Sequence, residues 1–96
     1  MIEIQSSVEF DQWIDTLRDR RAAAKVFDRI QRLEDGNPGD IKSVGDGILE
    51  MRINYGPGYR VYYTQRGSVI VLLLCGGDKS TQAKDIRRAI QIAAEW

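Results

Sequence analysis

Apolar residues in the amino-terminal part of the chain recur first at strand spacing and then at helix spacing. Residues 2–5 alternate isoleucine with polar side chains, which predicts a short strand. A helix is predicted to start at Ser6, because Ser6 and Glu9 have the spacing of a capping box, in which each side chain satisfies an exposed amide of the other. The apolar residues of this helix form one stripe, at Phe10, Trp13, Ile14 and Leu17.

A second helix is predicted after a break at residues 19–21, and it is expected to stop at Gly36. Its predicted buried side consists of Ala22, Ala23, Val26, Phe27, Ile30 and Leu33. Two adjacent amphipathic helices joined by a short polar link predict a helical hairpin. Turn-forming residues fill positions 35–40 and 45–47, so a loop of about a dozen residues is expected between this hairpin and the next element.

Residues 49–55 and 59–64 alternate apolar and polar side chains around a Gly-Pro-Gly turn, which predicts a β-hairpin. With a three-residue turn, Arg52 faces Tyr62 and Ile53 faces Val61. The apolar face of this hairpin is expected to pack on the helices and carries Leu49, Met51, Ile53, Tyr55, Tyr59, Val61 and Tyr63. The opposite face is expected to be a polar surface and carries Glu50, Arg52, Asn54, Arg60, Tyr62 and Thr64.

The carboxy-terminal part of the chain begins with a continuous run of apolar residues at 69–75, within a strand predicted at 68–75 that is covered on both sides. Ser80 or Thr81 is expected to cap a last helix. The predicted buried residues of that helix are Ala83, Ile86, Ala89, Ile90 and Ala93. The order strand, helix, helix, three strands, helix predicts one α+β domain over residues 1–96, with a mainly antiparallel sheet of about four strands.

Composition removes several classes of protein and of chemistry. The longest apolar run has seven residues, whereas a membrane span needs about 18. The amino terminus has no signal-like stretch, so a cytoplasmic location is expected. Histidine is absent, which excludes Ser-His-Asp and Cys-His nucleophiles and imidazole metal ligands. Without histidine, an enzyme of this sequence must move protons with carboxylates, lysine, tyrosine or groups perturbed by arginine. The single cysteine, Cys75, is interpreted as an inert core thiol.

Charge is unevenly distributed although the formal net charge is zero. Residues 1–49 hold seven basic and ten acidic side chains, whereas residues 50–88 hold seven basic and three acidic ones. This segregation suggests one face suited to a polyanion, with ordinary scatter of solvated charge as the alternative.

The strongest candidate site combines the polar face of the hairpin with residues 76–79. If the last strand neighbours the hairpin, Lys79 comes close to Arg52 or Arg60. Arginine holds phosphate through two parallel hydrogen bonds, and lysine, tyrosine or glutamate can serve as general acid or base. The alternative is that Glu50 and Arg52 are routine cross-strand charges on a solvated sheet face. Glu50 with Asp78 is the only carboxylate pair considered for a metal, and no cofactor is expected.

Three strings resemble the HigB-like branch of the RelE/ParE toxin superfamily, the addiction-module killer proteins of bacterial and phage type II toxin–antitoxin loci. They are Leu49-Glu50-Met51-Arg52, Gly56-Pro57-Gly58-Tyr59-Arg60-Val61-Tyr62-Tyr63 and Leu73-Leu74-Cys75-Gly76-Gly77-Asp78-Lys79-Ser80-Thr81-Gln82. The resemblance covers nearly the whole chain. It implies a RelE-like microbial RNase fold and a metal-independent, ribosome-dependent endoribonuclease that cleaves mRNA and arrests translation. It also implies a cognate helix-turn-helix antitoxin, which binds and neutralises the toxin in a hetero-oligomer.

The resemblance also assigns roles to individual residues. Arg52 and Arg60 are expected to hold the scissile phosphate, and Lys79 to support the transition state or protonate the leaving 5′-oxygen. Tyr62 or Glu50 is the expected base. Further substrate contacts are expected from Tyr59, as a stacking platform, and from Asn54, Lys84 and Arg87. Two alternatives remain, namely a ParE-like DNA gyrase inhibitor with the same fold and a non-catalytic corepressor that only binds the antitoxin.

Overall fold

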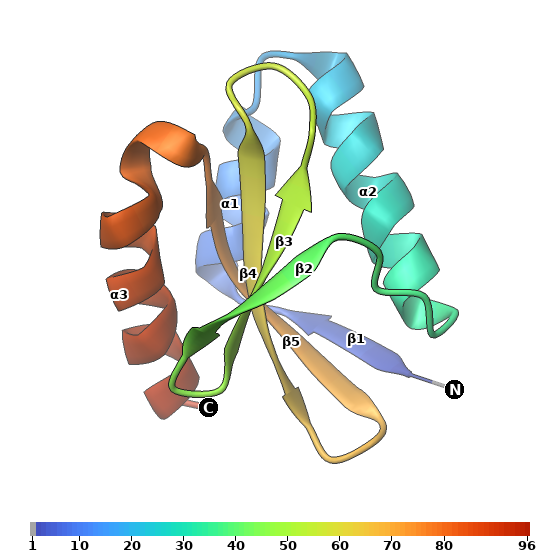
Figure 1. Cartoon of the computed structure of the whole chain (residues 1–96), viewed down its shortest axis with the longest axis vertical. Coiled ribbons are helices and arrows are strands. Elements are labelled where there is room, and N and C mark those ends of the chain that lie inside the picture. The colour runs from blue at the N-terminus through green and yellow to red at the C-terminus, as the bar shows by residue number, and fades with distance from the viewer. Residues whose placement is uncertain (1) are drawn as a thin grey trace.

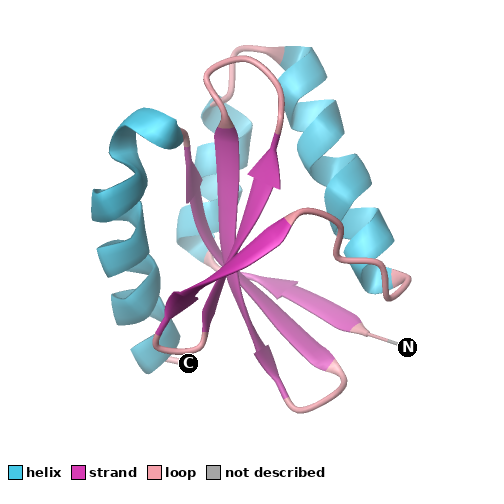
Figure 2. Ribbon diagram, viewed as in Figure 1, coloured by secondary structure: helices cyan, strands magenta, loops and turns pink. Residues whose placement is uncertain are grey.

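The computed structural model describes residues 2–96, which form three helices and one five-stranded sheet (Figures 1 and 2). The elements in chain order are β1 (Glu3–Ser6), α1 (Val8–Thr16), α2 (Arg20–Glu34), β2 (Ile41–Gly45), β3 (Ile48–Ile53), β4 (Tyr59–Arg66), β5 (Ile70–Gly77), a short 3-10 helix η1 (Lys79–Thr81) and α3 (Gln82–Ala94). The strand order is β1-β5-β4-β3-β2, and only the β1–β5 pair is parallel within the described chain. The predicted α+β class and mainly antiparallel sheet are therefore confirmed, whereas the predicted number of strands is one too low.

Helices cover both faces of the sheet, so the core is divided into two layers (Figure 1). The layer under α1 and α2 contains the apolar side chains of the hairpin, as predicted, together with two side chains of β5. These residues are Met51, Ile53, Val61, Tyr63, Val71 and Leu73. The layer under α3 contains Ile48, Tyr62, Leu72, Leu74, Ala89 and Ile92. Three predictions of burial are wrong. Phe27 on α2 is 54% exposed, Val69 precedes β5 and is exposed, and Ala83 on α3 is exposed, while the burial of Ile92 was missed.

Side-chain caps define where the first two helices begin. The predicted cap at Ser6 is wrong by one residue, because Ser6 still pairs with Leu73 as part of β1. Ser7 caps α1 instead, and its Oγ accepts a hydrogen bond from the backbone N–H of Phe10 at 2.9 Å. The predicted break between the two helices exists, but it lies at residues 17–19 and not at 19–21. Asp19 caps α2 by accepting from the backbone N–H groups of its first turn, so Arg20 and Arg21 are already helical.

The strand β2 lies in the segment that was predicted to be a loop, and this prediction is wrong. β2 pairs antiparallel with β3, with Ile41 opposite Met51, and forms one edge of the sheet. Its weak pattern has a physical reason, because an edge strand with exposed side chains needs little apolar alternation. Arg29 on α2 holds the chain ahead of β2 by donating hydrogen bonds to the carbonyls of Pro38 and Asp40.

The hairpin of β3 and β4 has a longer loop than predicted, and its register differs by two residues. Arg52 lies opposite Arg60 and Glu50 opposite Tyr62. The connection comprises residues 54–58, and its turn is closed by a hydrogen bond of 3.1 Å from the Gly58 N–H to the Tyr55 carbonyl. A shift of two residues keeps every side chain on its predicted face, because side chains alternate with period two.

Helix α3 covers most of the hairpin face that was predicted to be a polar surface. Glu50 and Tyr62 are completely buried there, and Thr64 is nearly so. Only the end of this face near the β3–β4 loop stays open. No helix within residues 2–96 is both long enough and apolar enough to cross a membrane.

Candidate anion-binding site

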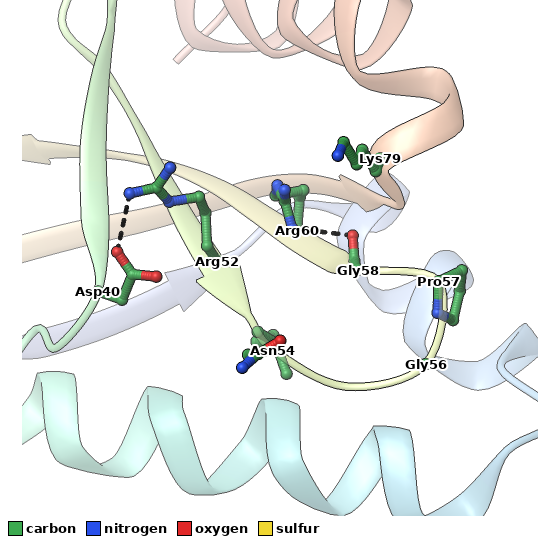
Figure 3. Close-up of a pocket in the computed structure, with 9 residues that line it drawn as sticks. Asp40, Arg52, Asn54, Gly56, Pro57, Gly58, Arg60 and Lys79 are labelled. Carbon is green, nitrogen blue, oxygen red and sulfur yellow. Dashed lines mark hydrogen bonds and ion pairs between the residues drawn. The ribbon is translucent and has the colours of Figure 1, made fainter.

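An open pocket of about 490 Å³ lies where the β3–β4 loop, the start of β2 and the start of η1 meet (Figure 3). Three of its lining side chains are cations, namely Arg52, Arg60 and Lys79, and its one lining carboxylate is Asp40. The remaining lining residues are Ile53, Asn54, Gly56, Pro57 and Gly58. The pocket therefore offers an excess of positive charge to any ligand that enters it.

Strand pairing brings the three cations together from segments far apart in the chain. Arg52 and Arg60 lie opposite each other on β3 and β4. Arg60 also lies opposite Gly77 on β5, so that Lys79, two residues further along, reaches the same place. From the sequence, the end of the last strand was expected to bring Lys79 near Arg52 or Arg60, and all three line the same pocket.

Gly58 allows Arg60 and Lys79 to lie side by side. A Cβ atom on Gly58 would lie 3.3 Å from Arg60 Nη1 and 3.5 Å from Lys79 Cβ, and the residue has a positive φ of 82°. Arg60 Nη1 donates to the Gly58 carbonyl at 3.0 Å (Figure 3). The positive φ favours glycine at this position, and an added Cβ would press on the end of the Arg60 side chain.

A buried carboxylate lies beneath Arg60. Glu50 is 0% exposed, and its Oε2 accepts hydrogen bonds from the Tyr62 hydroxyl at 3.0 Å and from Gln82 Nε2 at 2.7 Å. Its Oε1 lies 3.8 Å from Arg60 Nε, and both of these atoms are without a hydrogen bond in the described chain. The Glu50 carboxylate therefore forms an ion pair with the guanidinium of Arg60 on its buried side, while the Arg60 side chain lines the pocket.

The predicted role of Tyr62 or Glu50 as the base is not supported by this placement. Both side chains are fully buried and bonded to each other, so neither reaches a ligand in the pocket. Burial, together with the neighbouring Glu50 carboxylate, raises the pKa of Tyr62, which makes its hydroxyl a poor base. Glu50 instead holds Arg60 in position.

Asp40 is a pocket residue that the sequence analysis missed, because it was assigned to a turn. Its carboxylate accepts a hydrogen bond from Arg52 Nη2 at 3.0 Å, and both side chains are substantially exposed, at 57% and 40% (Figure 3). Its carbonyl accepts from the Arg52 N–H at 3.0 Å. The signal that could have found Asp40 is an acidic residue at the start of a strand that pairs with the Arg52 strand, and that strand was not predicted.

The other predicted substrate contacts are divided among different places. Asn54 lines the pocket. Tyr59 lies on the opposite side of the sheet, where its ring packs against Trp13 with 6.5 Å between centroids, and it does not line this pocket. Lys84 lines a separate pocket of about 360 Å³, and Arg87 is exposed on α3 and lines neither pocket.

The carboxylates of Glu50 and Asp78, which were considered from the sequence as a metal-binding pair, and the thiol of Cys75 each have a different environment. Asp78 accepts hydrogen bonds from the Ser80 side chain and backbone, which lower its pKa, while Glu50 is buried under α3. Within residues 2–96, no group of three or more acidic, histidine or cysteine side chains is placed to hold a metal ion. Cys75 is buried as predicted, and burial raises the pKa of its thiol to about 12.

Comparison with known proteins assigns the family. The model of the family described as phage-derived protein, Gp49-like, matches residues 12–95. The chain belongs to the Gp49-like family. A protein of Haemophilus influenzae (strain ATCC 51907 / DSM 11121 / KW20 / Rd) whose function is uncharacterized is 55% identical over 94 residues, which cover 98% of this chain and 95% of that protein.

The family match corrects one prediction and leaves others open. The Gp49-like family is distinct from RelE/ParE, so the assignment to the HigB-like branch of that superfamily is wrong. The family match spans residues 12–95 and therefore includes the three strings on which that resemblance was based. Gp49-like proteins are phage-derived and often associated with toxin–antitoxin systems. The matched range includes every residue that lines the anion-binding pocket.

Proposed function

We propose that this Gp49-like protein is a toxin that cleaves mRNA, and that the pocket of Arg52, Arg60 and Lys79 binds the scissile phosphate. The observation that carries the proposal is the convergence of these three cations on one open pocket beside a single exposed carboxylate. Two arginines and a lysine match the charge and the hydrogen-bonding geometry of a phosphodiester in its transition state. The association of the family with toxin–antitoxin systems supports the toxin role.

The proposed reaction uses the groups that line the pocket. Arg52 and Arg60 hold the non-bridging phosphate oxygens, and Asp40 takes the proton of the RNA 2′-hydroxyl. The 2′-oxygen then forms a bond to phosphorus while the bond from phosphorus to the 5′-oxygen breaks. Lys79 protonates the departing 5′-oxygen, which leaves a 2′,3′-cyclic phosphate and a free 5′-hydroxyl. The reaction needs no metal, and Glu50 acts only by holding Arg60.

The proposal includes two kinds of partner. The substrate is mRNA on the translating ribosome, where the ribosome supplies most of the binding surface that a small chain of zero net charge does not. A cognate helix-turn-helix antitoxin neutralises the toxin in a hetero-oligomer. Such a partner is required if the free protein arrests growth in the cell that makes it.

The test is tightly induced expression, with pulse labelling of protein and DNA synthesis in the same culture and mapping of mRNA ends. The wild-type chain is compared with Lys79→Ala and with Lys84→Ala, a matched control in which the lysine removed lines a different pocket. Protein synthesis is expected to stop first, with new mRNA ends inside coding regions. Lys79→Ala is expected to lower the cleavage rate about 10²–10³-fold, and Lys84→Ala to leave it unchanged.

Three outcomes contradict the proposal. If DNA synthesis stops first while messages stay intact, the target is DNA gyrase or replication. If expression is harmless, the chain is a non-catalytic corepressor. If Lys79→Ala and Arg52→Ala cleave as fast as the wild type, the reaction takes place outside this pocket.

A further inference from the structure

The free edge of β1 and the apolar side chains beside it form a surface distinct from the anion-binding pocket, at the opposite edge of the sheet from β2. Two pockets flank this edge, of about 510 and 410 Å³, and Ile4 lines both. The larger is walled by Phe10, Ile14, Phe27 and Ile30, and the smaller by Ile2 and Val69. We call the free backbone of residues 4–6 together with these two pockets the β1 edge surface.

The backbone of β1 is open on its outer side. The Glu3 N–H donates to the Val69 carbonyl at 2.6 Å and the Ser7 N–H to the Leu73 carbonyl at 2.9 Å. In a parallel pair, alternate residues bond to the neighbouring strand, so Ile4 and Ser6 direct their N–H and C=O groups away from β5. No strand of the described chain covers that side. Such an edge can accept an additional strand.

Two apolar side chains beside the edge are far more exposed to solvent than core residues are. Phe27, which the sequence pattern placed in the core, is 54% exposed over the larger pocket, and Val69 is exposed at the smaller one. Residues i and i+2 of an added strand lie about 7 Å apart on one face. Ile2, just before β1, and Ile4 on β1 both pack on the sheet face under α1 and α2. Two such residues of an added strand, on that same face, would therefore lie beside the two pockets.

Charge identifies the kind of partner. Every charged residue that lines either pocket is acidic, namely Glu3, Asp11, Asp15 and Glu34. None of these has an ion-pair partner within residues 2–96. A nucleic acid is therefore repelled, and so is a second copy of the same surface. The acidic excess of residues 1–49 is thus partly gathered at this edge, while the basic pocket is built from residues 52–79.

We propose that the β1 edge surface binds an extended segment of a different protein, which adds a strand to β1. The segment carries apolar side chains at two alternate positions and lysine or arginine beside them. The inference uses no residue of the anion-binding pocket, so it stands whether or not that pocket cleaves RNA.

The test is selection of a displayed library of random 12-residue peptides on the purified full-length chain. The enriched sequences are expected to show apolar residues at i and i+2 with flanking Lys or Arg. Phe27→Ser is expected to weaken the best peptide about tenfold. Val8→Ser is the matched control, since Val8 is 67% exposed and lines neither pocket. Backbone N-methylation of the peptide at the residues that face β1 is expected to abolish binding, because it removes the strand hydrogen bonds.

Several results overturn the proposal. These are no enriched peptide, an acidic consensus, a helical i, i+3, i+4 pattern, or an N-methylated peptide that binds as well as the parent. Equal binding to the wild type and to Phe27→Ser also overturns it, provided that circular dichroism shows both chains folded. Amide chemical shifts give an independent readout, because a bound peptide should shift Ile4 and Ser6 and leave Arg60 and Lys79 unchanged.

Discussion

Replacing Glu50 by glutamine removes one negative charge from beneath the anion-binding pocket and keeps the shape of the side chain. The oxygen of glutamine can still accept the hydrogen bonds from Tyr62 and Gln82, so the substitution isolates the charge interaction with Arg60. Glu50 is fully buried and the Arg60 side chain is 13% exposed, so solvent screens this pair poorly.

The magnitude follows from the distance between the two groups. At 3.8 Å, two unit charges attract by about 4 kcal/mol at an effective dielectric constant of about 20. The buried carboxylate no longer has to be desolvated in the variant, which cancels part of this term, so we expect a loss of about 3 kcal/mol in the free energy of unfolding. The total free energy of unfolding of a chain of 96 residues is typically about 5–14 kcal/mol. The loss is therefore a large share of the stability.

Urea unfolding followed by the fluorescence of Trp13 and Trp96 measures the effect. The midpoint should fall by about 1–3 M for Glu50→Gln. Arg52→Gln is the control, because its ion pair with Asp40 is exposed and should contribute less than about 1 kcal/mol.

A double-mutant cycle completes the test. The double variant Glu50→Gln/Arg60→Gln should lose free energy of unfolding, but at least about 1 kcal/mol less than the sum of the losses of the two single variants. The reason is that neither charge is then left buried alone. Strict additivity, or a Glu50→Gln chain as stable as the wild type, would refute the reasoning.

Three further predictions concern other parts of the fold. Gly76→Ala should destabilise the protein by about 2–3 kcal/mol in urea, because the added Cβ falls on the indole ring of Trp13. Cys75 should resist alkylation by iodoacetamide at pH 8 in the folded chain, since its thiol, with a pKa of about 12, stays protonated there. Asp19→Ala should lower the melting temperature at pH 7. The backbone N–H groups of Ala22 and Arg21 lower the pKa of Asp19, so its stabilisation is present above about pH 4 and is lost as pH falls through the lowered folded-state pKa.

Each of these three predictions has a contradicting result. A Gly76→Ala chain with unchanged midpoint would show that Trp13 moves aside without loss. Alkylation of Cys75 at the same rate in native and urea-unfolded protein would show that the thiol is accessible. For Asp19→Ala, a difference in melting temperature that stays constant down to pH 2 would show that the ionised carboxylate does not contribute.

The sequence predicted the elements well where the local pattern is strong. The stripe from Phe10 to Leu17 and the alternation in residues 49–55 and 59–64 place the helices, the hairpin and its two faces correctly. The predicted hairpin register was wrong because a Gly-Pro-Gly sequence does not determine how many residues form the loop. Residues 54–58 form the connection between the strands. The edge strand β2 was missed because its exposed side chains carry little apolar pattern.

The candidate site was predicted in part. Lys79 was expected near Arg52 or Arg60, and all three line one pocket. Asp40 was not expected there, because its position depends on β2 and on the hydrogen bonds that Arg29 makes.

The sequence by itself determined the α+β class, the two faces of the hairpin and a chemistry without histidine. Periodicity and composition are properties of the sequence itself, so they can be read without knowing which helix covers which face of the sheet. Only the tertiary structure decided which polar residues meet solvent. Helix α3 covers Glu50 and Tyr62 while the end of the same face at Arg52 stays open, and no pattern within β3 or β4 records the placement of a helix formed by later residues. For that reason Glu50 supports Arg60 from below, and Asp40 is the carboxylate at the pocket.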